Sequence, residues 1–320
     1  MSITRRLLGK AALGLAGAAL LMQGTALAAD KPAPFDKPGV KIALVRYLST
    51  GDFFQAYLSG VEAQAKALGV DLRVLDSRQD AALQADMVDQ AIALGVQGII
   101  IQHGLTESMK DAAQRAVDAG IKVVAFDVNV ENPKIPQIEQ SDKDLAKLAL
   151  EQAVKDNGES WKAGYVYVAG IAPLDRRNET WVDVKKKYSG ISEVAQFGTL
   201  DNPIANSVAN QARSVLQAHP DIKVLYASND MMAAGALLAA KGAGKDVKII
   251  GTDGLPGPAG GIEAVAKGDW AATFTYPTGA KEAIEMSKKI LLDCATSVDA
   301  TVTVDTTAIT AENAKALAGK

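Results

Sequence analysis

The sequence is poor in the residues from which metal centres and disulfide bonds are built. Its 320 residues contain one cysteine and two histidines. Zinc, haem and iron–sulfur sites take most of their ligands from these two residue types. We therefore expect no metal site and no cofactor, and the single cysteine, Cys294, excludes an internal disulfide bond.

The sequence also has no excess of positive charge. It carries 34 Lys and Arg residues against 37 Asp and Glu residues, a net charge of −3, with no basic block. Proteins that bind nucleic acid or anionic lipid rely on clustered basic side chains, so neither partner is expected. A hydrophobic share of 48% predicts a folded core. The length favours two domains, at about 150 residues each.

Long apolar runs are lacking except at the N-terminus. The segment 1–10 is short and basic, and the segment 11–22 is apolar. Ala26-Leu27-Ala28 then places small residues at the spacing of a signal-peptidase cleavage site. These three parts are typical of a secretory signal peptide, and the apolar run is too short to span a bilayer comfortably. We predict a signal peptide over 1–28 and a proline-containing linker over 29–38, which makes the protein periplasmic.

The export route stays open at this point. Thr4-Arg5-Arg6-Leu7-Leu8-Gly9-Lys10 resembles a twin-Arg signal, although Gly9 departs from the usual pattern. Both the Sec and the twin-Arg routes fit these residues.

Strands and helices are predicted to alternate along the rest of the chain. Strands are expected over 40–47, 70–75, 98–101 and 122–126, with helices over 52–68, 81–94 and 107–119. After a break with two prolines, Pro133 and Pro136, further strands are expected over 164–168, 193–197, 224–227, 247–251 and 271–275, with helices over 143–155, 179–188, 204–218, 231–240, 258–266 and 278–293. Short apolar strands between such helices indicate parallel sheets covered on both faces.

This pattern predicts an α/β fold with two doubly wound lobes, because the proline-rich break divides the alternation into two similar halves. The element count alone leaves a single (β/α)₈ barrel open.

Polar and aromatic residues collect where the predicted strands end, which is where ligands bind in open parallel sheets. The set consists of Tyr47, Phe53, Phe54, Gln102, Asp127, Asn129, Arg177, Asn229, Asp253 and Tyr276. Aromatic rings stack on the C–H faces of a sugar, and charged groups form strong hydrogen bonds to hydroxyls. The set therefore favours a neutral polyhydroxy ligand.

Several of these positions have a simpler structural interpretation. One of the two phenylalanines could belong to the core, and Asp52 and Asp230 are more typical of helix N-termini. His103 is interpreted as a solvated loop residue. Arg176 and Arg177 are adjacent, so at most one is expected to face the cleft. The glycine-rich segment 254–261 is interpreted as a flexible turn.

From Val40 to about Thr303 the chain resembles a periplasmic sugar-binding protein of the ribose/galactose type, the soluble receptor of an ABC importer. The motifs that carry the resemblance are Asp52-Phe53-Phe54, Lys122-Val123-Val124-Ala125-Phe126-Asp127, Arg177-Asn178-Glu179-Thr180-Trp181, Ser228-Asn229-Asp230-Met231-Met232-Ala233-Ala234-Gly235, Ile249-Ile250-Gly251-Thr252-Asp253-Gly254 and Ala271-Ala272-Thr273-Phe274-Thr275-Tyr276.

The resemblance implies a function for several of these residues. Phe53 and Phe54 would flank a sugar ring, and Asp127 would bind its hydroxyls. Arg177, Asn229 and Asp253 would close over it, with Tyr276 next to the hinge; Trp181, in the same motif as Arg177, joins the candidate site.

The sequence also departs from the ribose receptor. Val128 replaces the arginine that follows the aspartate in the family, and Gly51 replaces an asparagine. The hydrogen-bond pattern therefore differs, and a different pentose, a deoxy sugar, a hexose or a polyol is open.

The family's domain organisation implies an N-terminal lobe over 39–138 plus 277–300 and a C-terminal lobe over 139–276 plus 301–320. Three crossings would form a hinge that closes on the ligand. The implied protein is a monomer that delivers its solute to a membrane ABC permease.

Two alternatives differ in class. The same receptor could serve a chemoreceptor or sensor kinase, or a secreted enzyme could act on sugars with Asp127 and Asp253 as paired carboxylates. A sugar-responsive repressor shares this fold, but the export signal and the lack of an N-terminal helix-turn-helix exclude it. On the receptor interpretation, Arg177→Ala or Asp253→Ala abolishes binding and barely changes the melting temperature of the unliganded protein.

Overall fold

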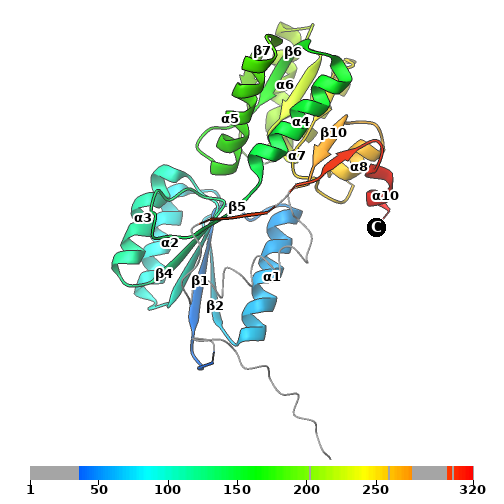
Figure 1. Cartoon of the computed structure of the whole chain (residues 1–320). Helices are drawn as coiled ribbons and strands as arrows, with labels where there is room; N and C mark the ends of the chain where they lie inside the picture. The colour runs from blue at the N-terminus through cyan, green and yellow to red at the C-terminus, as the bar shows by residue number, and fades with distance from the viewer. Residues whose placement is uncertain (1–35, 202, 259, 276–300, 305, 320) are drawn as a thin grey trace, which may run out of the picture.

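The computed structural model describes residues 36–201, 203–258, 260–275, 301–304 and 306–319. Two lobes, each built on its own six-stranded sheet, lie one above the other in Figure 1. Two separate sheets exclude the single barrel and confirm the predicted class of two doubly wound lobes.

The first lobe has the strand order β11-β5-β4-β3-β1-β2, and the printed pairings are all parallel. Its elements are β1 (Lys41–Arg46), α1 (Asp52–Leu68), β2 (Asp71–Asp76), α2 (Ala81–Ala93), β3 (Gly98–Gln102), α3 (Thr106–Asp118), β4 (Lys122–Phe126), β5 (Gln137–Gln140) and β11 (Thr301–Val304). In Figure 1, α1 lies on one side of the sheet and α2 and α3 lie on the other.

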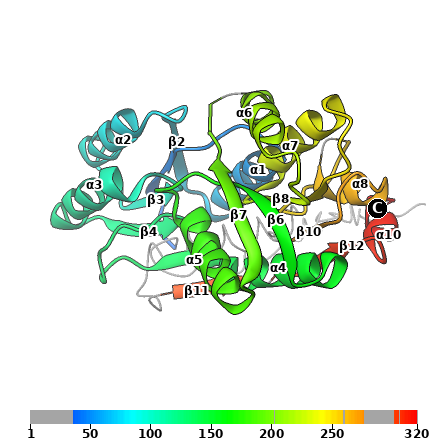
Figure 2. The same cartoon turned by 90° about the horizontal axis from the view of Figure 1, so that it is seen from above.

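The second lobe has the order β12-β10-β9-β8-β6-β7, which matches the first position by position. Its elements are α4 (Asp142–Asn157), β6 (Ser160–Val166), α5 (Ala172–Lys187), β7 (Gly190–Phe197), α6 (Ile204–Ala218), β8 (Val224–Ala227), α7 (Asp230–Gly242), β9 (Lys248–Ile250), α8 (Gly261–Ala266), β10 (Ala272–Phe274), β12 (Ala308–Thr310) and α10 (Ala314–Ala318). Figure 2 looks down on this lobe, with α4 and α5 on one side of β6 and β7 and α6 and α7 on the other. Only the β10–β12 pair among its described strands is antiparallel.

Strand β1 shows why these sheets are buried on both faces. Ile42 and Leu44 belong to one apolar cluster, whereas Ala43 and Val45 belong to another on the opposite face. Successive side chains of a strand point to opposite faces, so a continuous apolar run is needed when helices cover both. The helices end as the sequence predicts, for example at Gly69, whose φ of 70° gives α1 a left-handed C-cap.

The chain passes between the two sheets three times: after β5, between β10 and β11, and between β11 and β12. The predicted boundary at residue 138 falls inside β5, which pairs with β4 of the first sheet through residue 138. The predicted placement of the whole stretch 301–320 in the second lobe needs a correction, because β11 pairs with β5 of the first sheet. A four-residue strand carries no signal for the sheet that it joins, since either edge could accept it.

Other differences concern the ends of the elements. Helix α5 begins at Ala172, seven residues before the predicted start, with Pro173 in its first turn, where the missing N–H of proline costs no hydrogen bond. The strands β5, β11 and β12 were not predicted. The helix expected over 278–293 and the residues 277–300 assigned to the first lobe lie outside the described residues. Within the described part of the chain, no helix has both the length and the apolar character to cross a membrane.

Candidate functional site

A cleft lies between the lobes, at the carboxyl ends of the strands. Together with the solvent at its mouth it encloses about 650 Å³. The described residues that line it are Leu48, Gly51, Phe53, Phe54, His103, Ile171, Pro173, Leu174, Arg177, Leu200, Ile204, Asn229, Met231, Asp253 and Leu255.

The first lobe lines the cleft mainly with aromatic rings. Phe53 and Phe54, at the start of α1, pack edge to face with centroids 5.2 Å apart, and His103 lies 5.2 Å from Phe54. The buried Arg46 donates a hydrogen bond from Nη2 to the Phe54 carbonyl at 3.0 Å. This hydrogen bond anchors the first turn of α1, which carries the two phenyl rings that line the cleft.

His103 was interpreted as a solvated loop residue, and the structure shows that this is wrong. Only 4% of the residue is exposed, and it lines the cleft directly after β3. Burial, together with the charges of Arg176, Arg177 and Arg46, lowers its pKa to about 3, so the imidazole is neutral at ordinary pH. Its buried Nδ1 has no hydrogen-bond partner among the described residues.

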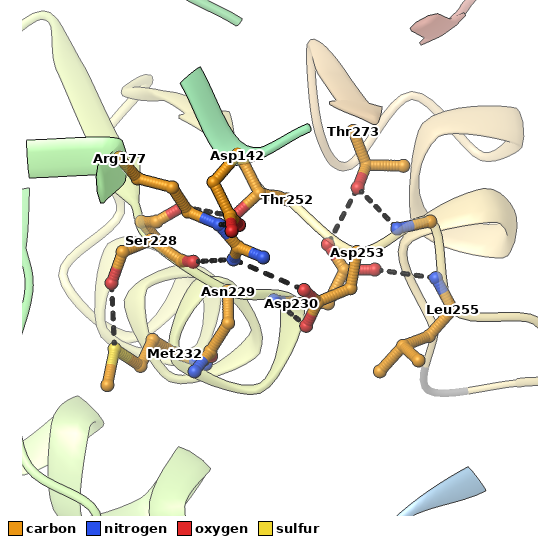
Figure 3. Close-up of polar contacts among 12 residues, drawn as sticks. Asp142, Arg177, Ser228, Asn229, Asp230, Met232, Thr252, Asp253, Leu255 and Thr273 are labelled. Carbon is orange, nitrogen blue, oxygen red and sulfur yellow. Dashed lines mark hydrogen bonds and ion pairs between the residues drawn. The ribbon is translucent and has the colours of Figure 1, made fainter. Parts of the chain in front are cut away.

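The second lobe contributes the charged groups, and Arg177 is at their centre (Figure 3). Only 2% of Arg177 is exposed. Its Nε donates to Asp142 Oδ1 at 2.7 Å, and its Nη1 donates to the Ser228 carbonyl and, at 3.3 Å, to Asp253 Oδ1. These contacts fix the guanidinium on the wall of the cleft.

Asp253 follows β9 and reaches into the cleft with 14% of its side chain exposed. Its φ of 153° is rare for a residue other than glycine, and such strain concentrates at functional positions. Its Oδ2 accepts from the Asp230 N–H at 3.2 Å. Burial raises the pKa of Asp253 and of the neighbouring Asp230, so the protonated form of this pair is favoured above the ordinary carboxyl range.

Asp230 acts as a structural anchor rather than as a lining residue. Its Oδ2 accepts from the backbone N–H of Leu255 at 2.8 Å and of Gly261 at 3.1 Å, and Thr273 donates to its Oδ1. The glycine-rich segment 254–261 is therefore tied near both ends, and it presents Leu255 to the cleft.

Asn229 combines a capping role with a position in the cleft wall. Its Oδ1 accepts from the Met232 N–H at 2.7 Å, which caps α7. Among the described residues nothing accepts a hydrogen bond from its Nδ2, so the amide has donors left for a ligand.

The two lobes touch one another around the cleft. Leu105 and Ile171 form an isolated antiparallel bridge, and Gln79 Nε2 donates to the Leu200 carbonyl at 3.4 Å. Arg176 Nη2 lies 3.1 Å from Asp127 Oδ1. The two adjacent arginines therefore have different roles. Arg177 lines the cleft, and Arg176 forms an ion pair between the lobes.

Five of the predicted site residues line the cleft: Phe53, Phe54, Arg177, Asn229 and Asp253. Tyr276 lies outside the described residues. The other five have different surroundings, and none of them is among the described lining residues.

Tyr47 and Gln102 are buried in the first lobe, where Gln102 Oε1 accepts from Arg46 Nε at 3.0 Å. Asp127 is 1% exposed and adjoins the cleft through Arg176. Asn129 is exposed and accepts from the Glu131 N–H at 2.9 Å, as in an Asx turn. Trp181 is fully buried among the Tyr165 and Tyr226 rings. Asn129 and Trp181 therefore do not belong to the cleft wall.

Sequence reasoning missed the apolar part of the wall. These residues are Leu48, Ile171, Pro173, Leu174, Leu200, Ile204, Met231 and Leu255. An apolar residue near a strand end has the same pattern whether it packs in a core or faces a ligand, so no local signal separates the two. His103 could have been predicted as a lining residue, because it lies at the carboxyl end of a predicted strand, where ligands bind in parallel sheets.

Two lobes of equal strand order around a cleft at the strand ends define a two-lobed solute-binding protein. Residues 42–293 match the model of the family described as "Periplasmic binding protein domain". The chain belongs to this family.

Named relatives are sugar-import binding proteins. The chain is 31% identical to the D-apiose import binding protein of Paraburkholderia graminis over 85% of this chain and 88% of the relative. It is also 31% identical to the ribose import binding protein of Escherichia coli over 78% of this chain and 84% of the relative.

A solved structure with the same fold is the 5-methylthioribose transporter solute-binding protein of Thermotoga lettingae, in complex with 5-methylthioribose. The TM-score is 0.77 at 30% identity, over 85% of this chain and 86% of the other. The likeness thus extends over both lobes of the solute-binding fold.

Proposed function

We propose that the protein is a periplasmic receptor that binds a monosaccharide or polyol in the interlobe cleft and delivers it to a membrane ABC permease. The observation that carries this proposal is the composition of the two walls. Phenyl rings from one lobe lie across the cleft from Arg177, Asn229 and Asp253 of the other.

Each wall suits a different part of a sugar. The rings of Phe53 and Phe54 can pack on apolar C–H faces. Asp253 can accept from hydroxyls, while Arg177 and Asn229 can donate to them, and hydrogen bonds to charged groups are worth about 1.5–3 kcal/mol each. The relatives support this ligand class through the solutes in their names.

The proposal is one of binding and release, without bond chemistry. Asp127 pairs with Arg176 and is not among the described lining residues, whereas Asp253 lines the cleft, so the two carboxylates do not face one another as the pair of a sugar-active enzyme would. Closure of the lobes around the solute would create the surface that the permease recognises. A chemoreceptor or sensor kinase is the second candidate partner for that same closed form.

Export is part of the proposal. Residues 1–28 would be removed as a signal peptide, by the Sec or the twin-Arg route, and the mature protein would act as a monomer.

A thermal-shift screen of the mature chain, from Ala29 onward, tests the function. The candidates are pentoses, hexoses, deoxy sugars, polyols and, as a control class, amino acids. A ligand at 100 times its Kd stabilises the folded state by about 2.7 kcal/mol, which raises the melting temperature by several degrees. A response to a sugar or polyol supports the proposal. Silence across all sugars and polyols, or a response only to amino acids, overturns it.

A further inference from the structure

The described wall of the cleft is more apolar than a fully hydroxylated sugar requires. Its polar side chains are His103, Arg177, Asn229 and Asp253, and apart from Gly51 the other described lining residues are apolar. A monosaccharide exposes a hydroxyl on almost every carbon. Each hydroxyl that is buried without a partner weakens binding by about 5- to 150-fold.

Strand order shows where the polar groups lie along the cleft. In the second sheet the order β9-β8-β6-β7 places Asp253 after β9 and Asn229 after β8, whereas Leu200 follows the edge strand β7. Neighbouring strands are about 4.8 Å apart, so the end of β7 lies about three strand spacings from that of β9. The carboxylate and Leu200 therefore belong to opposite ends of the cleft.

The first lobe has the same gradient. Its order β4-β3-β1-β2 places His103 after β3, and Leu48 and Gly51 after β1. The hydrogen bond from Gln79, which follows β2, to the Leu200 carbonyl aligns the β2 side of one lobe with the β7 side of the other. The apolar sides of the two walls therefore face one another.

Met231 joins the two walls at this end. A Cβ built on Gly51 would lie 3.8 Å from Phe54 Cδ2 and 3.9 Å from Met231 Sδ, so the α1 and α7 starts meet here. Ile204, the first residue of α6, lines the same wall, and α6 packs along α7. We call Leu48, Leu200, Ile204 and Met231 the apolar end of the cleft.

Resting on the proposed sugar-binding function, we propose that the ligand is a monosaccharide with a terminal apolar substituent, such as a deoxy or alkylthio sugar, and that the apolar end of the cleft holds that substituent. The hydroxyls of the ring would pair with Arg177, Asn229 and Asp253. The methyl or alkylthio group would pack on Leu200, Ile204 and Met231, where a terminal hydroxyl would find none of the four polar lining side chains.

Isothermal titration of one matched series tests this: ribose, 5-deoxyribose and 5-methylthioribose. These sugars differ only at the terminal carbon. One methylene-sized group in an apolar pocket is worth about 10- to 200-fold, so we expect 5-methylthioribose to bind at least about 100-fold more tightly than ribose, with 5-deoxyribose between them. Ribose binding as tightly as the substituted sugars overturns the inference and leaves the receptor function standing. A lack of response to these and to all other sugars in the thermal-shift screen overturns both.

A matched pair of substitutions locates the subsite. Met231→Gln keeps the length of the side chain and adds an amide, so the preference for 5-methylthioribose over ribose should fall about tenfold. Met87→Gln makes the same change on α2, where Met87 packs beneath the first lobe outside the described wall, and it should leave the preference unchanged. A preference that survives Met231→Gln contradicts the assignment of the apolar end.

Discussion

The two lobes share one strand order but present different chemistry to the cleft. The first lobe contributes phenyl rings and a neutral histidine, whereas the second contributes an arginine, an amide and a carboxylate. Equal topology places side chains at equivalent strand ends, but the residue at each end decides what it does. One wall therefore provides aromatic rings without a charged group, and the other combines polar anchors with aliphatic side chains.

The two aspartates at equivalent strand ends show this most clearly. Asp127 follows β4 and Asp253 follows β9, and both have positive φ, 50° and 153°. Asp127 is buried against Arg176, while Asp253 is held by Arg177 and keeps 14% of its side chain exposed to the cleft. The same position thus makes a contact between the lobes in one half and forms part of the cleft wall in the other.

The largest effect is expected from Arg177→Ala. Asp142 would keep Arg176 as a cation, but the Ser228 carbonyl and Asp142 Oδ1 would lose the buried guanidinium that donates to them. Leaving a buried acceptor without its donor costs about 1–3 kcal/mol. Urea denaturation of the unliganded variant should show that loss, and titration calorimetry should show no sugar binding. Arg213→Ala, on an exposed face of α6, is the control and should change neither.

This expectation replaces the one drawn from the sequence alone, in which the substitution spared the stability of the unliganded protein. The sequence does not show that Arg177 is 2% exposed and bound to Asp142. Normal stability of Arg177→Ala would contradict its role as a buried anchor.

The next effect separates the two aspartates. Asp253→Asn should weaken sugar binding by about 10- to 100-fold, because an amide replaces the carboxyl group that Arg177 holds at the cleft wall. Asp127→Asn should weaken binding less than about fivefold, since its carboxylate faces Arg176 rather than the cleft. Calorimetry on both variants measures the difference, and equal losses would mean that the lobes do not divide their roles.

The pH dependence of stability should have opposite signs in the two lobes. The pKa of His103 is lowered from 6.5 to about 3 in the folded state, so its contribution is present above pH 6.5 and is lost as pH falls toward 3. Between pH 7 and 5 this amounts to about 2 kcal/mol. Burial raises the pKa of Asp253 above 3.8, so its contribution is present below pH 3.8 and is lost as pH rises through the raised value.

Urea denaturation of two variants at pH 5 and pH 7 measures these opposite pH dependences of stability. Relative to the wild type, His103→Asn should retain more stability at pH 5, and asparagine tolerates the positive φ of this position. Asp253→Asn should retain more stability at pH 7. Shifts of the same sign in both variants would refute the comparison.

The smallest effect is expected for Asn129→Ala. Asn129 is exposed and holds only the local Asx turn to Glu131. Sugar affinity should stay within about twofold of the wild type, and stability should fall by no more than about 0.5 kcal/mol, as for most surface substitutions. A large loss of affinity would return this residue to the binding site.

Much of the fold follows from local pattern. Glycines such as Gly69 end the helices, and apolar runs such as that of β1 mark strands buried on both faces. The strands β5 and β11 were not found in this way, because polar residues interrupt the apolar ones in Gln137–Gln140 and Thr301–Val304.

The polar residues of the site could also be predicted from local sequence pattern. Charged and amide residues directly after a buried strand, such as Asp253 and Asn229, stand out against apolar surroundings. The apolar residues of the site could not be predicted, because Leu200 and Met231 have the sequence pattern of core residues. Only the position of the other lobe shows that they line a cleft.

The sequence by itself determined the two-lobed class, the order of the elements and the residues at the strand ends, because periodicity and turn chemistry act over a few residues. Only the tertiary structure decided that Arg176 contacts Asp127 of the other lobe, that His103 is buried and neutral, and that apolar side chains of both lobes meet at one end. Those outcomes depend on contacts between segments distant in the chain, which no local pattern records.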